Sequence, residues 1–397
     1  MTDRLRVGVF FGSRSVEHEV SVITAQQVMA AMTSTSLVPV PVYIAKSGAW
    51  YTGDLLLQLD RYKDIDRLVA ASTRVTMRPD PGSEGELLEV DGRRGLLGGS
   101  PRAVTRFDVA MPLVHGSNGE DGTLQGLFEL AGVAYCGCDV AAAAVSMDKR
   151  LCRTALRGAG LPVLDDVAVA RVRWLTEPDG VIDELEHSPG YPMYVKPRRL
   201  GSSIGVARVD ARDPLRDTLD VAFRYDTSIL AEPAQEAIIE INCAVLGQGD
   251  DVQVSVCEQP VSTGTLSYAD KYLSGAKAKG SAPAPAMGMK SAQRLIPAPI
   301  SASLTTRIQD AAMSAFRAIG ATGVTRIDFL VSTERDAFVI NELNTLPGSL
   351  SFYLWEASGI GFGTLIGRLV DMALTRHREQ LATTSSIDTW LLTGRPG

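Results

Sequence analysis

Apolar runs and polar glycine loops alternate along the first third of the chain. Residues 7–11 are continuously apolar, a glycine–serine turn follows, and a helical pattern then runs from about 16 to 32. A buried strand, a tight turn and a helix are typical of the opening of a doubly wound α/β unit. Further apolar runs predict strands at 37–44 and 109–114. The pattern therefore predicts an α/β fold that begins with an open parallel sheet.

The remainder of the chain has a less even pattern. The stretch 60–104 is rich in Asp, Arg, Gly and Pro, so we expect a surface excursion with at most short strands. Residues 141–159 read as one helix that ends at Gly160. A Gly-, Ala-, Pro- and Lys-rich segment at 274–292 predicts a mobile loop. Strands are expected at 191–196, 204–209, 228–230, 237–246, 252–257, 323–331 and 337–344, and helices at 123–130, 303–320 and 362–374.

Composition and charge narrow the possible partners and the compartment. A chain of 397 residues predicts two or three domains. With 39 basic and 46 acidic residues the net charge is −7, which argues against a nucleic-acid partner. No apolar stretch reaches the roughly 20 residues of a membrane span. The five cysteines do not form a disulfide scaffold and the first residues do not resemble a secretory signal, so we expect a cytoplasmic protein.

The most informative motif lies in the two strands expected near the C-terminus. Strand alternation places Arg326 and Asp328 on one face of the first strand, and Glu342 and Asn344 on one face of the second. In a hairpin Asp328 lies opposite Glu342, and two carboxylates about 5 Å apart repel each other unless a cation lies between them. Oxygen ligands without Cys or His favour magnesium. The alternative is an exposed strand face that carries ordinary surface acids.

A second motif, KPRRLGSSIG, begins at Lys196 and combines a lysine with a glycine–serine loop between two expected strands. Such a loop can turn several backbone N–H groups toward one anion. The order differs from a Walker A loop, which runs strand–GxxxxGK[ST]–helix. We interpret it as a β-hairpin flap over the phosphates of a nucleotide. A lysine before a polar hairpin is also a common surface feature, so this interpretation depends on the neighbouring magnesium face.

Three polar segments supply further candidates. Glu17 and His115 lie in glycine-flanked loops that follow expected strands, where ligands of open α/β sheets bind. Glu17 could equally complement a helix dipole, and His115 could be a packed loop residue. The segment SYADKY, which ends at Tyr272, enters the loop at 274–292. A Lys–Tyr pair there is typical of a lid that closes over substrate, or of a solvated loop.

Taken together, these motifs resemble the D-alanine–D-alanine ligases of the ATP-grasp superfamily. The resemblance runs from about Arg6 to Leu374 and is carried by FFGSRSVEHEVS, HGSNGEDGTLQGLFELAG, SMDK, YVKPRRLGSSIGV, YADKY, TRIDF and NELNTLPG. It implies a cytoplasmic homodimeric ligase of peptidoglycan precursor synthesis that uses ATP and two Mg²⁺, with Mn²⁺ as a possible substitute. It also implies an N-terminal α/β substrate domain at 1–140, a central ATP-grasp subdomain at 141–231, a C-terminal ATP-grasp subdomain at 232–384 and a tail at 385–397.

The resemblance also implies a role for each matching residue. ATP would be bound by Lys149, Lys196, Ser202, Ser203, Glu232, Pro233, Ala234, Glu240, Lys271 and Asn344. The metals would be held by Asp328, Glu342 and Asn344. Catalysis would depend on Glu17, Ser202, Tyr272, Arg326 and Gly348. The amino acids would contact Glu17, His115, Ser202, Arg326, Gly348, Tyr353 and Leu354. One residue more than the family pattern separates the adenine hinge, Glu232 to Ala234, from the ribose carboxylate Glu240.

Two positions bear on the second amino acid. In the family a lid tyrosine, here Tyr272, accompanies D-alanine as acceptor, whereas depsipeptide-forming relatives carry histidine. After N-T-x-P-G the family places a serine that holds the acceptor's carboxylate, and here Tyr353 occupies that position. The resemblance thus implies a ligase that joins two D-alanines through an acyl phosphate. The alternatives are a ligase with another acceptor, in secondary metabolism, and a nucleotide-binding module without catalysis.

Overall fold

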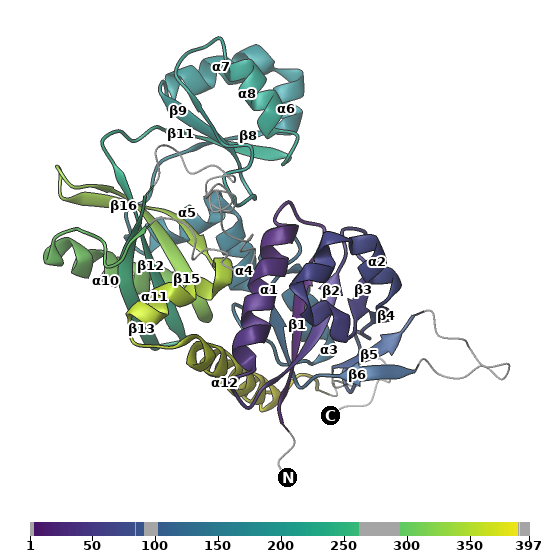
Figure 1. The fold of residues 1–397 in the computed structure, drawn as a ribbon. Coiled ribbons are helices and arrows are strands. Elements are labelled where there is room, and N and C mark those ends of the chain that lie inside the picture. The colour runs from purple at the N-terminus through teal and green to yellow at the C-terminus, as the bar shows by residue number, and fades with distance from the viewer. Residues whose placement is uncertain (1–3, 84, 91–101, 262–293, 388, 390–397) are drawn as a thin grey trace, which may run out of the picture.

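The computed structural model describes residues 4–83, 85–90, 102–261, 294–387 and 389, which form three sheets with their helices. In Figure 1 the sheet that contains β1 lies at the lower right, the one with β9 and β11 at the top, and the one with β12 and β15 at the left. The loop predicted at 274–292 and the site residues Lys271 and Tyr272 lie outside the described residues.

The N-terminal sheet has seven strands in the order β6-β5-β4-β3-β2-β1-β7. β1 (Arg6–Gly12) pairs in parallel with β2 (Val38–Ile44) and β7 (Val109–Pro112). The other pairs are antiparallel and involve β3 (Trp50–Thr52), β4 (Thr73–Thr76), β5 (Glu86–Glu89) and β6 (Ala103–Arg106). The sheet is therefore mixed, because the expected surface excursion adds short antiparallel strands to the parallel centre.

Helices cover both faces of this sheet, which explains why the β1 sequence is continuously apolar. Val9 packs in the cluster that includes α1 (His18–Met32) and α12 (Phe362–Leu381). The next residue, Phe10, faces the other side, where its ring lies 5.0 Å from that of Phe128 in α3. The remaining helices of the domain are α3 (Thr123–Ala131), η1 (Asp54–Leu57), η2 (Leu59–Lys63) and α2 (Ile65–Ala70).

The single helix predicted at 141–159 is wrong: it is two helices, α4 (Val140–Met147) and α5 (Lys149–Gly158). The break falls at Asp148, whose backbone is extended with ψ of 98°. Its carboxylate caps α5 by accepting the Leu151 amide at 3.1 Å, and it also accepts Arg198 Nε at 2.6 Å. This N-cap outweighs the helix propensity of the surrounding alanines and places Lys149 in the first turn of α5.

The central sheet has the order β10-β9-β11-β8 and is antiparallel throughout. Its strands are β8 (Val167–Ala170), β9 (Met193–Pro197), β10 (Ala207–Val209) and β11 (Ser228–Pro233). Their buried side chains pack against α6 (Arg171–Thr176), α7 (Pro178–His187) and α8 (Leu215–Ala222), seen at the top of Figure 1. The glycine–serine loop joins β9 to β10, as expected for a hairpin flap.

The C-terminal sheet has the order β14-β13-β12-β15-β16, with antiparallel neighbours. Its strands are β12 (Ile239–Gln248), β13 (Asp251–Pro260), β14 (Arg294–Leu295), β15 (Gly323–Ser332) and β16 (Ala337–Asn344). Alternate residues such as Ile327 and Phe329 pack with α10 (Ala302–Ala318), so Arg326 and Asp328 face the other side.

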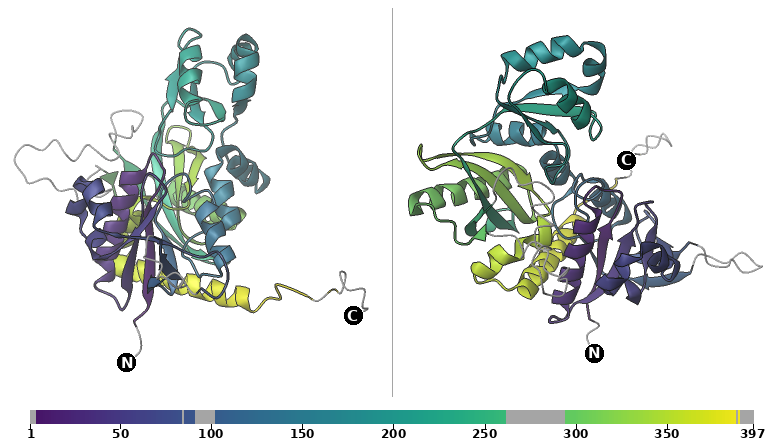
Figure 2. Two further views of the ribbon diagram at one scale, coloured as in Figure 1. Left: turned by 90° about the vertical axis from the view of Figure 1, so that its right-hand side faces the viewer. Right: turned by 45° about the horizontal axis from the view of Figure 1, so that its top comes forward.

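A 3-10 turn η5 (Gly348–Ser351), the short helix α11 (Phe352–Ala357) and α12 follow the last strand. α12 runs beneath the C-terminal sheet and reaches the N-terminal sheet, as two views show (Figures 1 and 2). Among the described residues, no single helix has the length and apolarity that crossing a membrane requires. The helices at 348–357 and 362–381 reach that length and apolarity only when they are taken together, and a bend of 117° separates them.

Candidate active site

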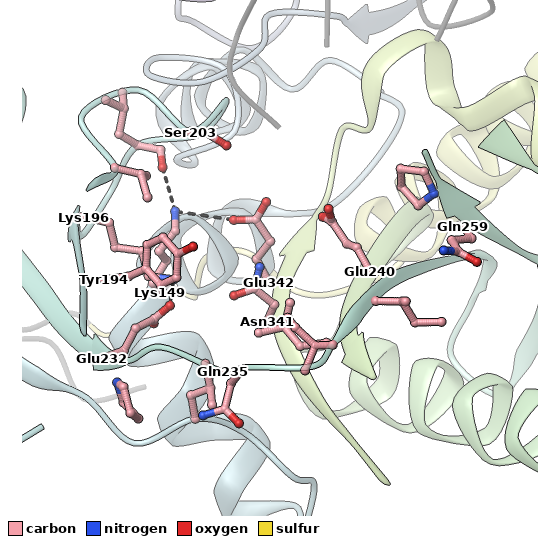
Figure 3. A pocket seen from close by; sticks show the side chains of 18 residues that line it. Lys149, Tyr194, Lys196, Ser203, Glu232, Gln235, Glu240, Gln259, Asn341 and Glu342 are labelled. Carbon is pink, nitrogen blue, oxygen red and sulfur yellow. Dashed lines mark hydrogen bonds and ion pairs between the residues drawn. The ribbon is translucent and has the colours of Figure 1, made fainter. Parts of the chain in front are cut away.

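A cavity of about 410 Å³ lies between the central and C-terminal sheets (Figure 3). Charged side chains enter it from both sheets and from α5. Of the predicted site residues, it is lined by Lys149, Lys196, Ser203, Glu232, Pro233, Glu240 and Glu342. The structure therefore brings predicted phosphate, hinge and ribose residues and one predicted metal residue, Glu342, around one space.

Lys149 connects the glycine–serine loop to the C-terminal sheet. Its Nζ donates to the Leu200 carbonyl at 2.6 Å and lies 3.7 Å from Glu342 Oε2. Both interactions appear as dashed lines in Figure 3, where Glu342 and Glu240 reach into the same space. An ammonium group in this position can meet the phosphates of a nucleotide that enters the cavity.

Lys196 belongs to a buried cluster of three charges. Its Nζ lies 2.5 Å from Glu232 Oε1, and the other oxygen of Glu232 accepts Arg153 Nη2 at 2.6 Å. Burial lowers the pKa of Lys196, although the Glu232 carboxylate opposes this effect. Burial would raise the pKa of Glu232, but the neighbouring Lys196 and Arg153 charges lower it overall. The Glu232 side chain is thus committed to two cations, which leaves only its backbone for an adenine hinge.

The hinge register differs from the prediction at one position. Pro233 and Gln235 line the cavity, whereas Ala234 does not, and the Ala234 amide already donates to the Pro192 carbonyl at 2.9 Å. Gln235 therefore stands where the sequence reasoning placed Ala234. The additional residue between the hinge and Glu240 was the signal that could have revealed this shift.

The predicted pairing of two carboxylates across the hairpin is confirmed. Asp328 on β15 stands directly opposite Glu342 on β16, and a register irregularity follows Asp328. Arg326 donates to both oxygens of Asp328, at 2.6 Å each, and Asn344 Nδ2 donates to Asp328 Oδ2 at 3.0 Å. Burial acts to lower the pKa of Arg326, but the neighbouring Asp328 charge outweighs this effect and raises it. Arg326 is therefore a fixed cation beside the carboxylate pair.

The donor atoms of this hairpin fit magnesium. Asp328, Glu342 and Asn344 supply only carboxylate and amide oxygens, and Mg²⁺ is commonly bound by one or two carboxylates together with phosphates and waters. Within the described part of the chain, no three His, Cys, Asp or Glu side chains gather as a metal site on their own. A metal here would therefore take part of its ligands from a bound nucleotide.

Glu17 and Ser202 join the N-terminal domain to the glycine–serine loop. Ser202 Oγ donates to Glu17 Oε1, and Ser202 and Ser203 both adopt positive φ, 55° and 56°. Gly116 lies on the other side of Glu17. A Cβ on Gly116 would stand 2.6 Å from Glu17 Oε2, so only glycine allows this approach. The structure thus brings together two distant motifs that the resemblance assigned to one site.

His115 is buried and neutral. Burial lowers its pKa to about 4, and its Nε2 lies 2.9 Å from the Thr24 hydroxyl. The same hydroxyl accepts the Ser349 amide at 3.2 Å, which connects the N-terminal helix to η5. Thr24 was missed by the sequence reasoning. Its position seven residues after Glu17, on the same face of a helix, was the available signal.

Glu120 was also missed, although it lies inside the HGSNGEDG motif. Its two oxygens accept the Gly116 amide at 2.7 Å and the Leu346 amide at 3.2 Å. Burial and the nearby Glu17 raise its pKa to about 8. Glu120 therefore bridges the glycine loop of the N-terminal domain and the NTLPG segment that follows β16.

The segment after Gly348 differs from the expectation for Tyr353 and Leu354. The Tyr353 hydroxyl donates to Glu258 at 2.8 Å, and Leu354 is buried in the hydrophobic core. Ser351 lies in a left-handed turn with φ of 49°, and its buried Oγ has no hydrogen-bond partner among the described residues. The hydroxyl available for a ligand in this segment is thus that of Ser351, three residues after Gly348.

Sequence models of this family cover both halves of the chain. The model described as D-ala D-ala ligase N-terminus matches residues 6–138, and the one described as D-ala D-ala ligase C-terminus matches residues 155–371. The chain belongs to the D-alanine–D-alanine ligase family. The predicted family and fold class are therefore confirmed.

Individual ligases agree with this assignment. The chain is 38% identical to the D-alanine–D-alanine ligase of Heliobacterium modesticaldum, covering 94% of this chain and 96% of the relative. It is 33% identical to D-alanine–D-alanine ligase A of Escherichia coli, covering 94% and 97%. The D-alanine–D-alanine ligase structure from Coxiella burnetii aligns with a TM-score of 0.76 at 28% identity over 96% and 97% of the two chains. The structure of the VanG D-Ala:D-Ser ligase of Enterococcus faecalis aligns with a TM-score of 0.74 at 28% identity. The alignment covers 94% of this chain and 100% of the VanG chain.

Proposed function

We propose that this member of the D-alanine–D-alanine ligase family joins two D-alanine molecules in an ATP-dependent reaction and so supplies a precursor of peptidoglycan. The observation that carries the proposal is the Asp328–Glu342 pair, of which Glu342 lines the cavity together with Lys149 and Lys196. Relatives named D-alanine–D-alanine ligase at 33–38% identity over nearly the full chain support the same reaction.

ATP occupies the cavity between the central and C-terminal sheets in this proposal. Lys149 and Lys196 contact its phosphates, the backbone near Pro233 contacts the adenine, and Glu240 binds the ribose hydroxyls. Lys271 is assigned to the γ-phosphate by resemblance. Asp328, Glu342 and Asn344 would hold Mg²⁺, or Mn²⁺ in its place, which neutralises charge on the phosphoryl oxygens when it is bound.

The reaction proceeds in two steps. A carboxylate oxygen of the first D-alanine attacks the γ-phosphorus, the bond to the β-phosphate oxygen breaks, and ADP leaves. The amine of the second D-alanine then attacks the carbonyl carbon of the acyl phosphate, loses a proton and forms the C–N bond as phosphate departs. Charge develops on phosphoryl and carbonyl oxygens, so Arg326 and the Gly348 amide stabilise the transition states electrostatically.

The first amino acid lies near the junction of the N-terminal domain and the glycine–serine loop. Glu17 binds its ammonium group, and Ser202 fixes Glu17. Neutral His115 lies near its carboxylate and adds no charge there. Tyr272 belongs to the lid in this proposal, and a closed lid protects the acyl phosphate from water.

The acceptor is less constrained, because Tyr353 is bonded to Glu258 and Ser351 has an unused hydroxyl. We assign the contact with the acceptor's carboxylate to Ser351 and Arg326, with Tyr353 and Leu354 behind them. A different acceptor is the second candidate function, and the similarity to a D-Ala:D-Ser ligase favours D-serine as its first test. A cytoplasmic homodimer, divided into domains at 1–140, 141–231 and 232–384, completes the proposal.

The test is phosphate release together with product analysis on the purified chain with ATP and Mg²⁺. D-Alanine alone should give one dipeptide and one phosphate per ATP, and L-alanine and EDTA controls should give neither. D-Serine and D-lactate, each added to D-alanine, distinguish the acceptors. Absence of dipeptide with D-alanine refutes the first candidate, and a mixed product that exceeds D-alanyl-D-alanine at equal concentrations supports the second.

A further inference from the structure

A row of polar residues crosses the C-terminal sheet at the level of Asp328. Glu258 on β13 is paired with Asn242 on β12, Asn242 with Asp328 on β15, and Asp328 with Glu342 on β16. Directly paired residues of antiparallel strands point to the same face and have Cα atoms about 4.5–5.5 Å apart. Asn242 therefore stands beside one of the two carboxylates proposed to hold the metal, on the face away from α10.

Glu258 fixes the orientation of the Asn242 amide. The Glu258 carboxylate is buried and accepts Asn242 Nδ2 at 3.1 Å, the Tyr353 hydroxyl at 2.8 Å and Arg294 Nη1 at 3.0 Å. A carboxylate bonded to an arginine acts as an acceptor, so the group that Asn242 presents to it must be the NH₂. The two ends of the Asn242 amide are thus distinguished by chemistry.

The other end of that amide has no hydrogen-bond partner within the described part of the chain. Asn242 is 4% exposed, and its Oδ1 is buried without a hydrogen bond among the residues that the structure describes. Because Nδ2 points toward Glu258 on β13, Oδ1 faces the opposite side, where β15 carries Asp328 and Arg326. Buried amide oxygens are almost always hydrogen-bonded, and an exception indicates a missing ion, water or ligand. The missing partner must be a donor, because a carbonyl oxygen only accepts.

We infer that Asn242 Oδ1 accepts a hydrogen bond from a water molecule bound to the metal that Asp328 and Glu342 hold. Asn242 is then a positioning residue of the metal site, and Glu258 with Arg294 and Tyr353 holds it in place. The inference rests on the proposed function. Mg²⁺ usually keeps several of its waters, and each of these waters has two protons to donate. Outer-shell partners of this kind typically change metal affinity 10- to 100-fold when they are removed.

The test measures Mn²⁺ affinity rather than turnover, from the electron paramagnetic resonance signal of free Mn²⁺ titrated with the full chain in the presence of ADP. Asn242→Leu keeps the side-chain volume and removes the acceptor, so it should weaken Mn²⁺ binding about 10- to 100-fold. Ser255→Ala is the matched control, because it removes a buried hydroxyl that bonds the Ala244 amide in the same sheet but outside the row. Its affinity should equal that of the unmodified chain.

An exchange variant separates this role from a loss of folding. In Asn242→Asp with Glu258→Gln, the amide and the carboxylate change places, so the hydrogen bond between them and the charge of the row are both retained. The exchange variant should recover at least a third of the affinity of the unmodified chain, whereas Asn242→Asp alone sets two carboxylates against each other and should not fold stably. Affinity of Asn242→Leu within threefold of the unmodified chain overturns the inference, as does a folded exchange variant as weak as Asn242→Leu. If the unmodified chain binds no Mn²⁺ with ADP, the proposed metal site itself fails.

Discussion

The buried charges around Glu232 offer the sharpest test of how the nucleotide cavity is built. Glu232→Gln keeps the size of the side chain and removes its charge. In the native chain that charge faces Lys196 at 2.5 Å and Arg153 at 2.6 Å, and all three residues are buried. After the substitution two buried cations face each other without the carboxylate between them.

The size of the effect follows from what each cation retains. Arg153 keeps a second partner, Asp166, at 3.2 Å, whereas Lys196 loses the only carboxylate that we find against it in the described structure. Breaking a buried ion pair costs about 3–5 kcal/mol. Because only one charge is left uncompensated, we expect the free energy of unfolding to fall by about 3 kcal/mol. With a urea dependence of about 2 kcal/mol per molar, the unfolding midpoint falls by about 1.5 M.

The assay is urea unfolding of the nucleotide-free chain, followed by circular dichroism at several pH values. Burial already lowers the pKa of Lys196, and the loss of Glu232 lowers it further. A cation whose folded pKa is lowered destabilises the fold as the pH falls from its unfolded pKa toward its folded pKa. The deficit should therefore shrink as the pH rises toward the unfolded pKa of lysine, about 10.4. Glu236→Gln is the control, since Glu236 pairs with Arg208 at 3.2 Å on an exposed surface where such pairs contribute about 0–1 kcal/mol. If the unfolding midpoint of Glu232→Gln lies within about 0.3 M urea of the control, the reasoning is refuted. At the same urea dependence, this difference corresponds to only about 0.6 kcal/mol of unfolding free energy.

Three further outcomes are expected. The His115 pKa of about 4 lies below the ordinary 6.5. The contribution of His115 to the free energy of unfolding is therefore fully present above pH 6.5 and falls by up to about 3 kcal/mol as the pH decreases to 4. His115→Gln should flatten this dependence in thermal unfolding, and an unchanged slope would contradict the assignment. Glu342→Gln should unfold at the same temperature as the native chain but lose most ligase activity; comparable turnover would remove Glu342 from the metal site. Lys149→Met removes the cation that bonds Leu200 and faces Glu342, so calorimetry should show ATP binding at least about tenfold weaker, and equal affinity would exclude a phosphate contact.

The Asp328–Glu342 pair could be predicted from the sequence because its two strands follow each other closely in the chain. Asp328 faces Glu342 because a short turn joins two strands, and alternation then decides which side chains share a face. Only the resemblance placed Ser202 and Glu17, which are 185 residues apart, in the same site. No periodicity in either segment indicates it. Local pattern and family likeness thus contributed different residues.

The sequence did not reveal which site residues bond side chains far away in the chain. Glu232 was assigned to the adenine hinge, but its carboxylate bonds Arg153, 79 residues away. Tyr353 was assigned to the acceptor, but its hydroxyl bonds Glu258, 95 residues away. Both are polar residues at plausible positions, and only tertiary packing decides whether such a side chain faces a ligand or a neighbouring side chain. The break at Asp148 is a similar case, because Arg198 supplies part of the reason for it.

Three cations of the site that the structure describes share one property: each already has a carboxylate beside it. Lys196 pairs with Glu232, Arg326 with Asp328, and Lys149 lies 3.7 Å from Glu342. Unpaired cations at these depths would cost several kcal/mol each, so the carboxylates make the nucleotide-free fold possible. The three pairs differ in how readily they can exchange partners. The Lys149–Glu342 contact is long and partly exposed, whereas the other two are short and buried. Phosphate binding should therefore displace Glu342 from Lys149 first, which frees that carboxylate for a metal at the moment the nucleotide arrives.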